Sequence, residues 1–398
     1  MRVLFWGLLS GSALALTACT HSPEKAKFDA NCDFGDTKFS AAFEAARLNG
    51  CRETAPNSYE LLIEPENTPI NQSAWYAFDI SAPADKMLNL TLVYSEGYHR
   101  YPIKKRIGAG EWQQIETRPD PKAKSDRHDF TIQTDGNPVR IAAQPIFDTA
   151  KHLKWIEAMS TLEYVDQTTI GQSVESRPII KLEEVDDPTK PYVLIVGRQH
   201  PPETTGADAL TPFVEAIWGD TEQAKNFRSQ YNLIVVPLLN PDGVFHGNWR
   251  HNMNGIDLNR DWGPFTQPET QAIEAELQRF EAGSDRIVAF VDFHSTWRNL
   301  LYTQTEEESA SPDGFTKKWV NIVDEKLDDD VYAFTREQSP NEGKPTSKNY
   351  MNSQFGITAV TYEVGDHTEI NATQLASKQF AETFMELFLR QSEMTNDK

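Results

Sequence analysis

Two short segments of the chain carry residue types that bind metal ions. His200 and Glu203 come directly after the apolar run Tyr192 to Val196, and His294 follows the apolar run Ile287 to Phe293. Two histidines and one glutamate are the ligand set of open catalytic zinc sites, which keep a position for water. If both runs are buried strands, the three side chains point into one cleft at the carboxyl ends of these strands. Taken singly, a histidine in such a position is more often structural.

The segment 240–262 lies between these residues in the sequence and is rich in groups that bind anions. It follows the apolar run Leu233 to Leu239, so we expect a loop beyond another strand. Loops in this position bind ligands in α/β proteins. Arg250, Arg260 and several amides in the segment suit the capture of an anion. The Asn-Pro-Asp-Gly sequence at its start is also an ordinary turn signal.

The motifs, taken in order, resemble those of the funnelin metallocarboxypeptidases, the family of pancreatic carboxypeptidase A. They are His-x-x-Glu, Asn-Pro-Asp-Gly, Gly-x-x-Arg, Gly-x-Asp-x-Asn-Arg and a histidine at the end of a strand. The resemblance covers residues 155–392. Within the family, the closest likeness is to the cytosolic-type carboxypeptidases, which have a β-sandwich ahead of the catalytic domain. The strand-like segment 75–78 resembles that preceding domain as well.

The resemblance implies a single zinc ion as the cofactor. His200, Glu203 and His294 would be its ligands, and Asp257 would orient His200 as a carboxylate partner of the kind that such ligands usually have. The zinc ion would lower the pKa of a bound water towards ~7 and so supply a nucleophile near neutral pH.

The resemblance also implies how a peptide is bound and cut. Glu363, near the end of a late strand, would take the proton of the water and pass it to the leaving amine. Arg250 would stabilise the charge that forms on the carbonyl oxygen. Asn259 and Arg260 would bind the terminal carboxylate of the substrate, so that residues are removed one at a time from a free C-terminus. The plain alternative for Glu363 is a surface or salt-bridged glutamate.

Two candidate substrate contacts depart from the family pattern or extend it. The family often has a substrate-closing tyrosine some twenty residues before its glutamate, and this sequence has none there. Tyr350, 13 residues before Glu363, is the nearest candidate. Lys348 falls where family members select the released side chain, and a basic residue would favour an acidic group such as glutamate or a diaminopimelate carboxylate. A solvated loop lysine is the alternative.

The N-terminus predicts export. A short apolar stretch after Met1-Arg2 is too short to span a membrane, and residues 1–18 therefore indicate a signal peptide. The sequence Leu-Thr-Ala before Cys19 resembles the lipobox of bacterial lipoproteins, which implies a lipid on Cys19 and a polar tether over residues 19–33. Thr20 after this cysteine favours the outer membrane, facing the periplasm. Ordinary cleavage nearby, with Cys19 incidental, is the alternative.

Lipidation of Cys19 would leave two cysteines. Because exported proteins fold in an oxidising compartment, Cys32 and Cys51 are predicted to form a disulfide. Two free buried thiols are the alternative. Neither cysteine has the spacing of a metal ligand.

The remaining pattern predicts two domains. Short alternating runs between about residues 59 and 147 are typical of an antiparallel β-sandwich, which we assign to residues 34–150. Residues 151–395 alternate apolar runs with helix-like stretches, of which 268–280 and 375–389 are examples. This alternation predicts an α/β catalytic domain with a mixed, mostly parallel sheet flanked by helices.

Composition and motifs together narrow the function. A formal net charge of −21 argues against binding of nucleic acid. The leading hypothesis is a zinc carboxypeptidase acting on peptides or cell-wall peptides with a free carboxylate. The alternatives are an amidase of peptidoglycan stem peptides, an N-acyl amino acid deacylase and a catalytically inactive peptide-binding lipoprotein. Export and the long stretch from Asn-Pro-Asp-Gly to Arg250 count against the deacylase.

Overall fold

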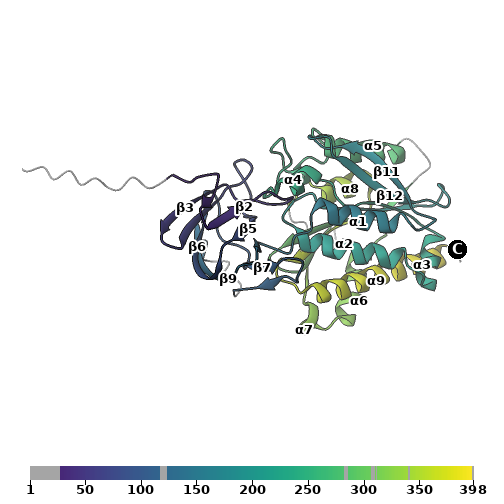
Figure 1. Ribbon diagram of the computed structural model, residues 1–398. Coiled ribbons are helices and arrows are strands. Elements are labelled where there is room, and N and C mark those ends of the chain that lie inside the picture. Colours follow the sequence, from purple (N-terminus) through teal and green to yellow (C-terminus); the bar gives the residue numbers. More distant parts are fainter. Residues whose placement is uncertain are drawn as a thin grey trace, which may run out of the picture.

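The computed structural model describes residues 27–116, 123–281, 286–305, 310, 312–338 and 341–396. The predicted signal peptide and Cys19 lie outside these residues. Within the described part of the chain, no helix is both long and apolar enough to cross a membrane. The chain forms a β-rich N-terminal domain beside a larger α/β domain (Figure 1).

The N-terminal domain consists of two packed sheets. One has the strand order β1-β2-β5-β10-β7-β8 and the other β3-β4-β6-β9. The strands are β1 (Asp33–Phe34), β2 (Thr37–Ser40), β3 (Gly50–Ala55), β4 (Ser58–Ile63), β5 (Ala77–Ser81), β6 (Ala84–Tyr94), β7 (Lys104–Ile107), β8 (Gln113–Gln114), β9 (Arg127–Asp135) and β10 (Val139–Ala142).

Alternation of side chains explains why these segments form a sandwich. In β4, Tyr59, Leu61 and Ile63 are buried and the residues between them are half-buried, so one face of the strand enters the core. The expected antiparallel pairing has one departure, because β4 and β6 run parallel. The chain leaves β4 for the other sheet, forms β5 there, and returns to place β6 beside β4 in the same direction.

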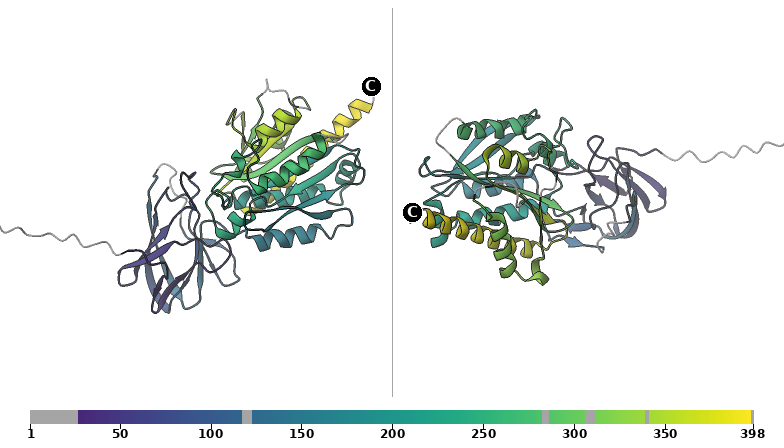
Figure 2. Two further views of the ribbon diagram at one scale, coloured as in Figure 1. Left: turned by 90° about the horizontal axis from the view of Figure 1, so that it is seen from above. Right: turned by 180° about the vertical axis from the view of Figure 1, so that it is seen from behind.

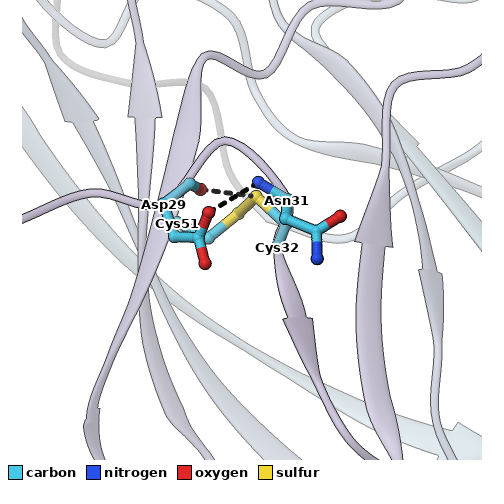
Figure 3. Close-up of a disulfide and its surroundings, with 4 residues drawn as sticks. All are labelled: Asp29, Asn31, Cys32 and Cys51. Atoms are coloured by element: carbon cyan, nitrogen blue, oxygen red, sulfur yellow. Dashed lines mark hydrogen bonds between the residues drawn. A yellow bond between two sulfur atoms is a disulfide. The ribbon is translucent and has the colours of Figure 1, made fainter.

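A disulfide ties the start of the described chain to the sandwich. Cys32 and Cys51 are bonded, with their Cα atoms 5.2 Å apart. Figure 3 shows the bond beside Asp29, whose backbone exchanges two hydrogen bonds with that of Cys51. The disulfide thus closes a loop that carries β1 and β2 and fixes it against β3.

The α/β domain is built on an eight-stranded sheet with the order β11-β12-β14-β13-β15-β18-β16-β17. The strands are β11 (Asp166–Gln172), β12 (Pro178–Glu184), β13 (Tyr192–Gly197), β14 (Asn232–Val236), β15 (Ile287–Thr296), β16 (Leu300–Thr303), β17 (Thr335–Gln338) and β18 (Thr358–Gly365). The central strands β14, β13, β15 and β18 are parallel, while β11, β12 and β16 add antiparallel pairs. This confirms the predicted mixed, mostly parallel sheet.

Helices cover both faces of this sheet (Figure 2). Residues of α1, α2, α3, α6, α7 and α9 pack in one apolar cluster, and residues of α5 and α8 pack in another. The helices are α1 (Thr149–Met159), α2 (Thr204–Ile217), α3 (Glu222–Arg228), α4 (Pro241–His246), α5 (Pro268–Glu281), α6 (Phe315–Lys326), α7 (Asp329–Tyr332), α8 (Ser347–Phe355) and α9 (Ile370–Asn396), with a short 3-10 turn η1 (Leu258–Arg260).

The register of the central strands decides which side chains meet. In β13 and β15, Gly197 pairs with Phe293, so His200 and His294 both follow the end of this shared ladder. In β15 and β18, His294 pairs directly with Glu363. Because the three strands are parallel, their carboxyl ends meet at one edge of the sheet.

The two domains are joined through a largely buried carboxylate of the sandwich, Glu66, whose side chain keeps 9% of its surface exposed. Glu66 accepts hydrogen bonds from the backbone N–H groups of Trp249, Arg250 and His251, at 2.7, 2.9 and 2.6 Å. The side chain of Trp249 is fully buried within the apolar core of the sandwich. Arg47 binds the same segment from its other end, through the backbone oxygens of residues 246 and 247. The loop 246–257 of the α/β domain is therefore shaped by the sandwich.

We expect Glu66→Ala to lower the free energy of unfolding by about 3 kcal/mol or more, because it leaves three buried N–H groups without their acceptor. Denaturant unfolding measures the change. Glu53→Ala is the control, since Glu53 is exposed on β3 and its loss should change stability by less than about 0.5 kcal/mol. Equal stability of the two variants would contradict this role of Glu66.

Candidate functional site

His200, Glu203 and His294 converge in the structure. The Nδ1 atoms of the two histidines lie 3.1 Å apart. The Glu203 carboxylate faces both rings, with its oxygens 2.9 Å from the Nδ1 atom of His200 and 2.7 Å from that of His294. All three residues are buried. Three ligand atoms thus surround one point at the carboxyl end of the sheet.

The opposite nitrogens of the two rings face carboxylates. The Nε2 atom of His200 is 2.9 Å from Asp257, and the Nε2 atom of His294 is 2.8 Å from Asp292. In the tautomer with the proton on Nε2, each ring donates a hydrogen bond to its carboxylate and keeps a lone pair on Nδ1. Two nitrogen lone pairs and a carboxylate then face one another. This arrangement fits a divalent cation, and the donor set is the one expected for zinc.

Charge interactions shift the pKa values of these groups. Burial disfavours the charged form of Glu203, but His200 and His294 outweigh it and hold the pKa of Glu203 well below its usual range. Burial acts in the same way on Asp257, and His200 with Arg250 lowers the pKa of this carboxyl. The carboxylates are therefore ionised over the physiological pH range, as metal ligands and their partners must be.

Glu363 stands next to this group on β18. Its Oε2 atom is buried and has no hydrogen-bond partner among the described residues. Burial, with help from Glu203 and Asp292, raises the pKa of Glu363 to about 8, while His294 and Arg250 oppose the shift. A carboxyl group with a raised pKa and an unpartnered oxygen in a pocket is suited to proton transfer.

The pocket around these residues has a volume of about 180 Å³ and is lined mainly by polar side chains. The lining residues predicted from the sequence are His200, Glu203, Arg250, Asn259, Arg260, His294, Lys348 and Glu363.

Arg250 and Arg260 occupy different positions in the pocket wall. Arg250 is buried and donates from Nε to Asp257 at 2.7 Å, so it shares this carboxylate with His200. Arg260 is half-buried and donates to the backbone oxygen of Asn259. The side-chain oxygen of Asn259 accepts from the backbone N–H of Ser347, which connects the 3-10 turn η1 to the first turn of α8.

Lys348 and Tyr350, both on α8, are separated by the structure. Lys348 is buried, lines the pocket, and has its Nζ atom 3.5 Å from the backbone oxygen of Thr303. The ring of Tyr350 lies against Phe265 and Trp262, with centroids 5.0 and 6.2 Å apart. Residues two apart on a helix point in different directions. Tyr350 therefore packs into the apolar cluster and is not among the pocket-lining residues.

Several residues of the site were not predicted from the sequence. Asp292 is fully buried and orients His294, and its signal was a charged residue inside an apolar strand run. Tyr302 lines the pocket beside Glu363. Asn71, Ser73 and Arg100 come from the sandwich, where no functional cluster was predicted from the sequence.

A second group of histidines and a carboxylate lies in the sandwich. Glu116 contacts the Nε2 atoms of His99 and His128 at 2.9 and 2.5 Å. The two rings stack with centroids 3.7 Å apart and planes within 5° of parallel. A metal ion binds in the plane of an imidazole ring, and one ion cannot lie in two parallel planes at this spacing. This group is therefore a hydrogen-bonded cluster, in which burial opposes but the histidines lower the pKa of Glu116 to about 2.

Solved structures share the fold of both domains. A metallo-carboxypeptidase from Burkholderia cenocepacia superposes with a TM-score of 0.74 at 19% identity, covering 90% of this chain and 100% of that one. A metallo-carboxypeptidase from Pseudomonas aeruginosa, in complex with (2-guanidinoethylmercapto)succinic acid, gives a TM-score of 0.72 at 19% identity, covering 88% and 98%. At this identity the likeness establishes the fold alone.

Sequence relatives point the same way. Cytosolic carboxypeptidase 6 of Caenorhabditis elegans is 22% identical over 366 residues, which cover 83% of this chain and 79% of that protein. Cytosolic carboxypeptidase 1 of Mus musculus is 33% identical over 109 residues, only 27% of this chain and 9% of the mouse protein.

The family model described as zinc carboxypeptidase matches residues 152–390, more than half of the chain and the whole of the ligand-bearing sheet. The resemblance inferred from the motifs is thereby confirmed. The chain belongs to the zinc carboxypeptidase family.

Proposed function

We propose that the protein is a zinc-dependent carboxypeptidase that hydrolyses the C-terminal peptide bond of its substrates. The observation that carries the proposal is the convergence of the two Nδ1 atoms and the Glu203 carboxylate beside the unpartnered Oε2 of Glu363. His200, Glu203 and His294 would hold the zinc ion. When bound, zinc supplies a Lewis acid for the scissile carbonyl and lowers the pKa of a water molecule towards ~7.

The protein's own groups supply proton transfer and charge stabilisation. Glu363 accepts a proton from the attacking water at Oε2 and passes it to the nitrogen of the leaving amine as the C–N bond breaks. It is ionised for this step when a nearby cation offsets the burial that raises its pKa. Arg250, held by Asp257 and by the backbone bond to Glu66, donates to the oxyanion. Such a donor is typically worth about 3 kcal/mol of barrier.

Cationic side chains of the pocket would select the free C-terminus of a substrate. Arg260 lines the pocket and offers a planar pair of donors, which suits the terminal carboxylate of a peptide. Lys348 is buried in the same pocket, so a released residue with an acidic side chain would gain a charge-assisted hydrogen bond there. Glutamate and diaminopimelate carboxylates are the acidic groups that this lysine fits.

The proposed setting is the periplasmic face of a membrane, with a lipid on Cys19 as the anchor. The lipobox-like sequence before Cys19 supports this placement. The Cys32–Cys51 disulfide supports export, because such bonds persist in oxidising compartments. Peptides and cell-wall peptides with a free carboxylate are accessible there.

Glu363→Gln should keep the metal and lose the reaction. The wild type is expected to bind about one zinc per chain and to release single C-terminal residues from a peptide library. The variant should bind the same zinc and show kcat/KM reduced by about 100- to 10,000-fold, since the base is missing. Elemental analysis and mass spectrometry of the peptides give both quantities.

Glu369→Gln is the matched control, because Glu369 is exposed shortly after β18. Full turnover by the Glu363 variant would sink the proposed mechanism. A zinc-loaded wild type that releases no residue from any peptide, yet cleaves stem peptides from peptidoglycan, would replace the carboxypeptidase by an amidase.

Lys348→Gln should change which residue is released. We expect kcat/KM for peptides ending in glutamate to fall by about 10- to 100-fold relative to peptides ending in glutamine, because a charge-assisted hydrogen bond is lost. Competition between the two peptides measures the ratio directly. Lys344→Gln is the control, since Lys344 is exposed just before α8. An unchanged ratio in the Lys348 variant would exclude this lysine as the selecting residue.

A further inference from the structure

One wall of the pocket belongs to the sandwich. Asn71, Ser73 and Arg100 line the same pocket as the metal-ligand residues. Asn71 and Ser73 lie in the loop between β4 and β5, which also contains Glu66, and Arg100 lies between β6 and β7. The loop that holds the Arg250 segment in place therefore continues into the pocket wall.

The guanidinium of Arg100 is fixed on three sides. Its Nε and Nη2 atoms donate to the same carboxylate oxygen of Asp366, at 2.9 and 2.8 Å. Its Nη1 atom donates to the backbone oxygen of Gln72 and to the hydroxyl of Ser73, both at 2.9 Å. These bonds join the sandwich to Asp366, directly after β18, and hold the planar group rigidly.

One donor of this group remains. The contacts use the Nε–H, both Nη1–H bonds and one of the two Nη2–H bonds, and the other Nη2–H has no acceptor in the described part of the chain. The side chain keeps 19% of its surface exposed. A guanidinium that is rigid, partly open and short of one acceptor is suited to binding an oxygen atom of a ligand.

Arg100 also carries a full charge beside the metal-ligand group. Burial opposes the charge, but Asp366 and Glu203 raise the pKa of Arg100 further above its ordinary value. Arg100 and Glu203 line the same pocket. Arg260 and Lys348, which are also cationic residues of the pocket, lie instead on η1 and α8 of the α/β domain.

This arrangement determines the direction in which a peptide chain would bind in the pocket. With its terminal carboxylate at Arg260 and its scissile carbonyl at the ligands and Arg250, a substrate has its acyl portion still to place. The polar wall formed by Asn71, Ser73 and Arg100 of the sandwich is available for that portion. Backbone carbonyl oxygens are the acceptors that every peptide presents there.

We infer that Asn71, Ser73 and Arg100 form a subsite of the sandwich for the backbone upstream of the scissile bond, with the remaining Nη2–H of Arg100 donating to a carbonyl oxygen. The ligand class is an extended peptide with at least one acyl or peptide group before the cleaved residue pair. This subsite rests on the proposed function. It makes the sandwich part of the substrate-binding surface.

Two matched substrates test the subsite. Both end in the residue that the wild type releases best. One has a propionyl group before it, which is alanine without its amino group, and the other has N-acetyl-alanine, which adds one upstream carbonyl. We expect the wild type to cleave the acetyl-alanyl substrate with the higher kcat/KM. Arg100→Lys and the double variant Arg100→Gln/Asp366→Asn should each reduce this advantage by about tenfold.

Their zinc content should equal that of the wild type, and kcat/KM should fall further for the acetyl-alanyl substrate than for the propionyl substrate. The double variant removes both charges together, so no buried carboxylate is left unpaired. Arg127→Gln is the control, since Arg127 is an exposed arginine of the sandwich.

The outcomes separate the two claims. If the advantage of the upstream carbonyl survives in both Arg100 variants, or if both substrates lose activity equally, the subsite is overturned while the carboxypeptidase stands. If the wild type releases the terminal residue from neither substrate, the proposed function fails and the subsite fails with it.

Discussion

The rest of the site depends on the hydrogen bonds that the carboxylate of Glu66 accepts. Three consecutive backbone N–H groups of the α/β domain donate to it. A loop of this kind has no ladder or helix of its own to satisfy its backbone, so its conformation is set by the partner that accepts these bonds. The partner belongs to the other domain. The sandwich is therefore a structural component of the pocket as well as a neighbour.

The consequences pass from this loop to the ligand atoms. The loop carries Arg250 and Asp257, and Asp257 holds both that arginine and the Nε2 atom of His200. Asp292, which lies within β15, holds the Nε2 atom of His294 in the same way. Because each carboxylate can accept a hydrogen bond from an Nε2–H, both Nδ1 atoms can keep their lone pairs for a cation. The contact between the domains thus shapes the loop, and the loop positions Asp257. Asp257 in turn orients His200 and so influences the affinity of the site for a metal ion.

The sequence predicted the parts of the site that local patterns determine. His200 and His294 follow apolar strand runs, and strand ends at one edge of a parallel sheet bring such residues together. Glu66 and Arg100 were not predicted, because no local sequence pattern identifies them as functional and their partners lie far away in the sequence. Tyr350 was chosen by its distance from Glu363 alone, whereas the apolar packing of α8 decides where its ring points.

The most direct measurement is anomalous X-ray diffraction from crystals of the zinc-loaded protein, recorded above and below the zinc absorption edge. We expect a single strong peak between the Nδ1 atoms of His200 and His294 and the carboxylate of Glu203. The absence of a peak there would contradict the proposed zinc site. A peak at the stacked pair His99 and His128 in place of this one would contradict it as well, because two parallel rings at this spacing should not share one ion.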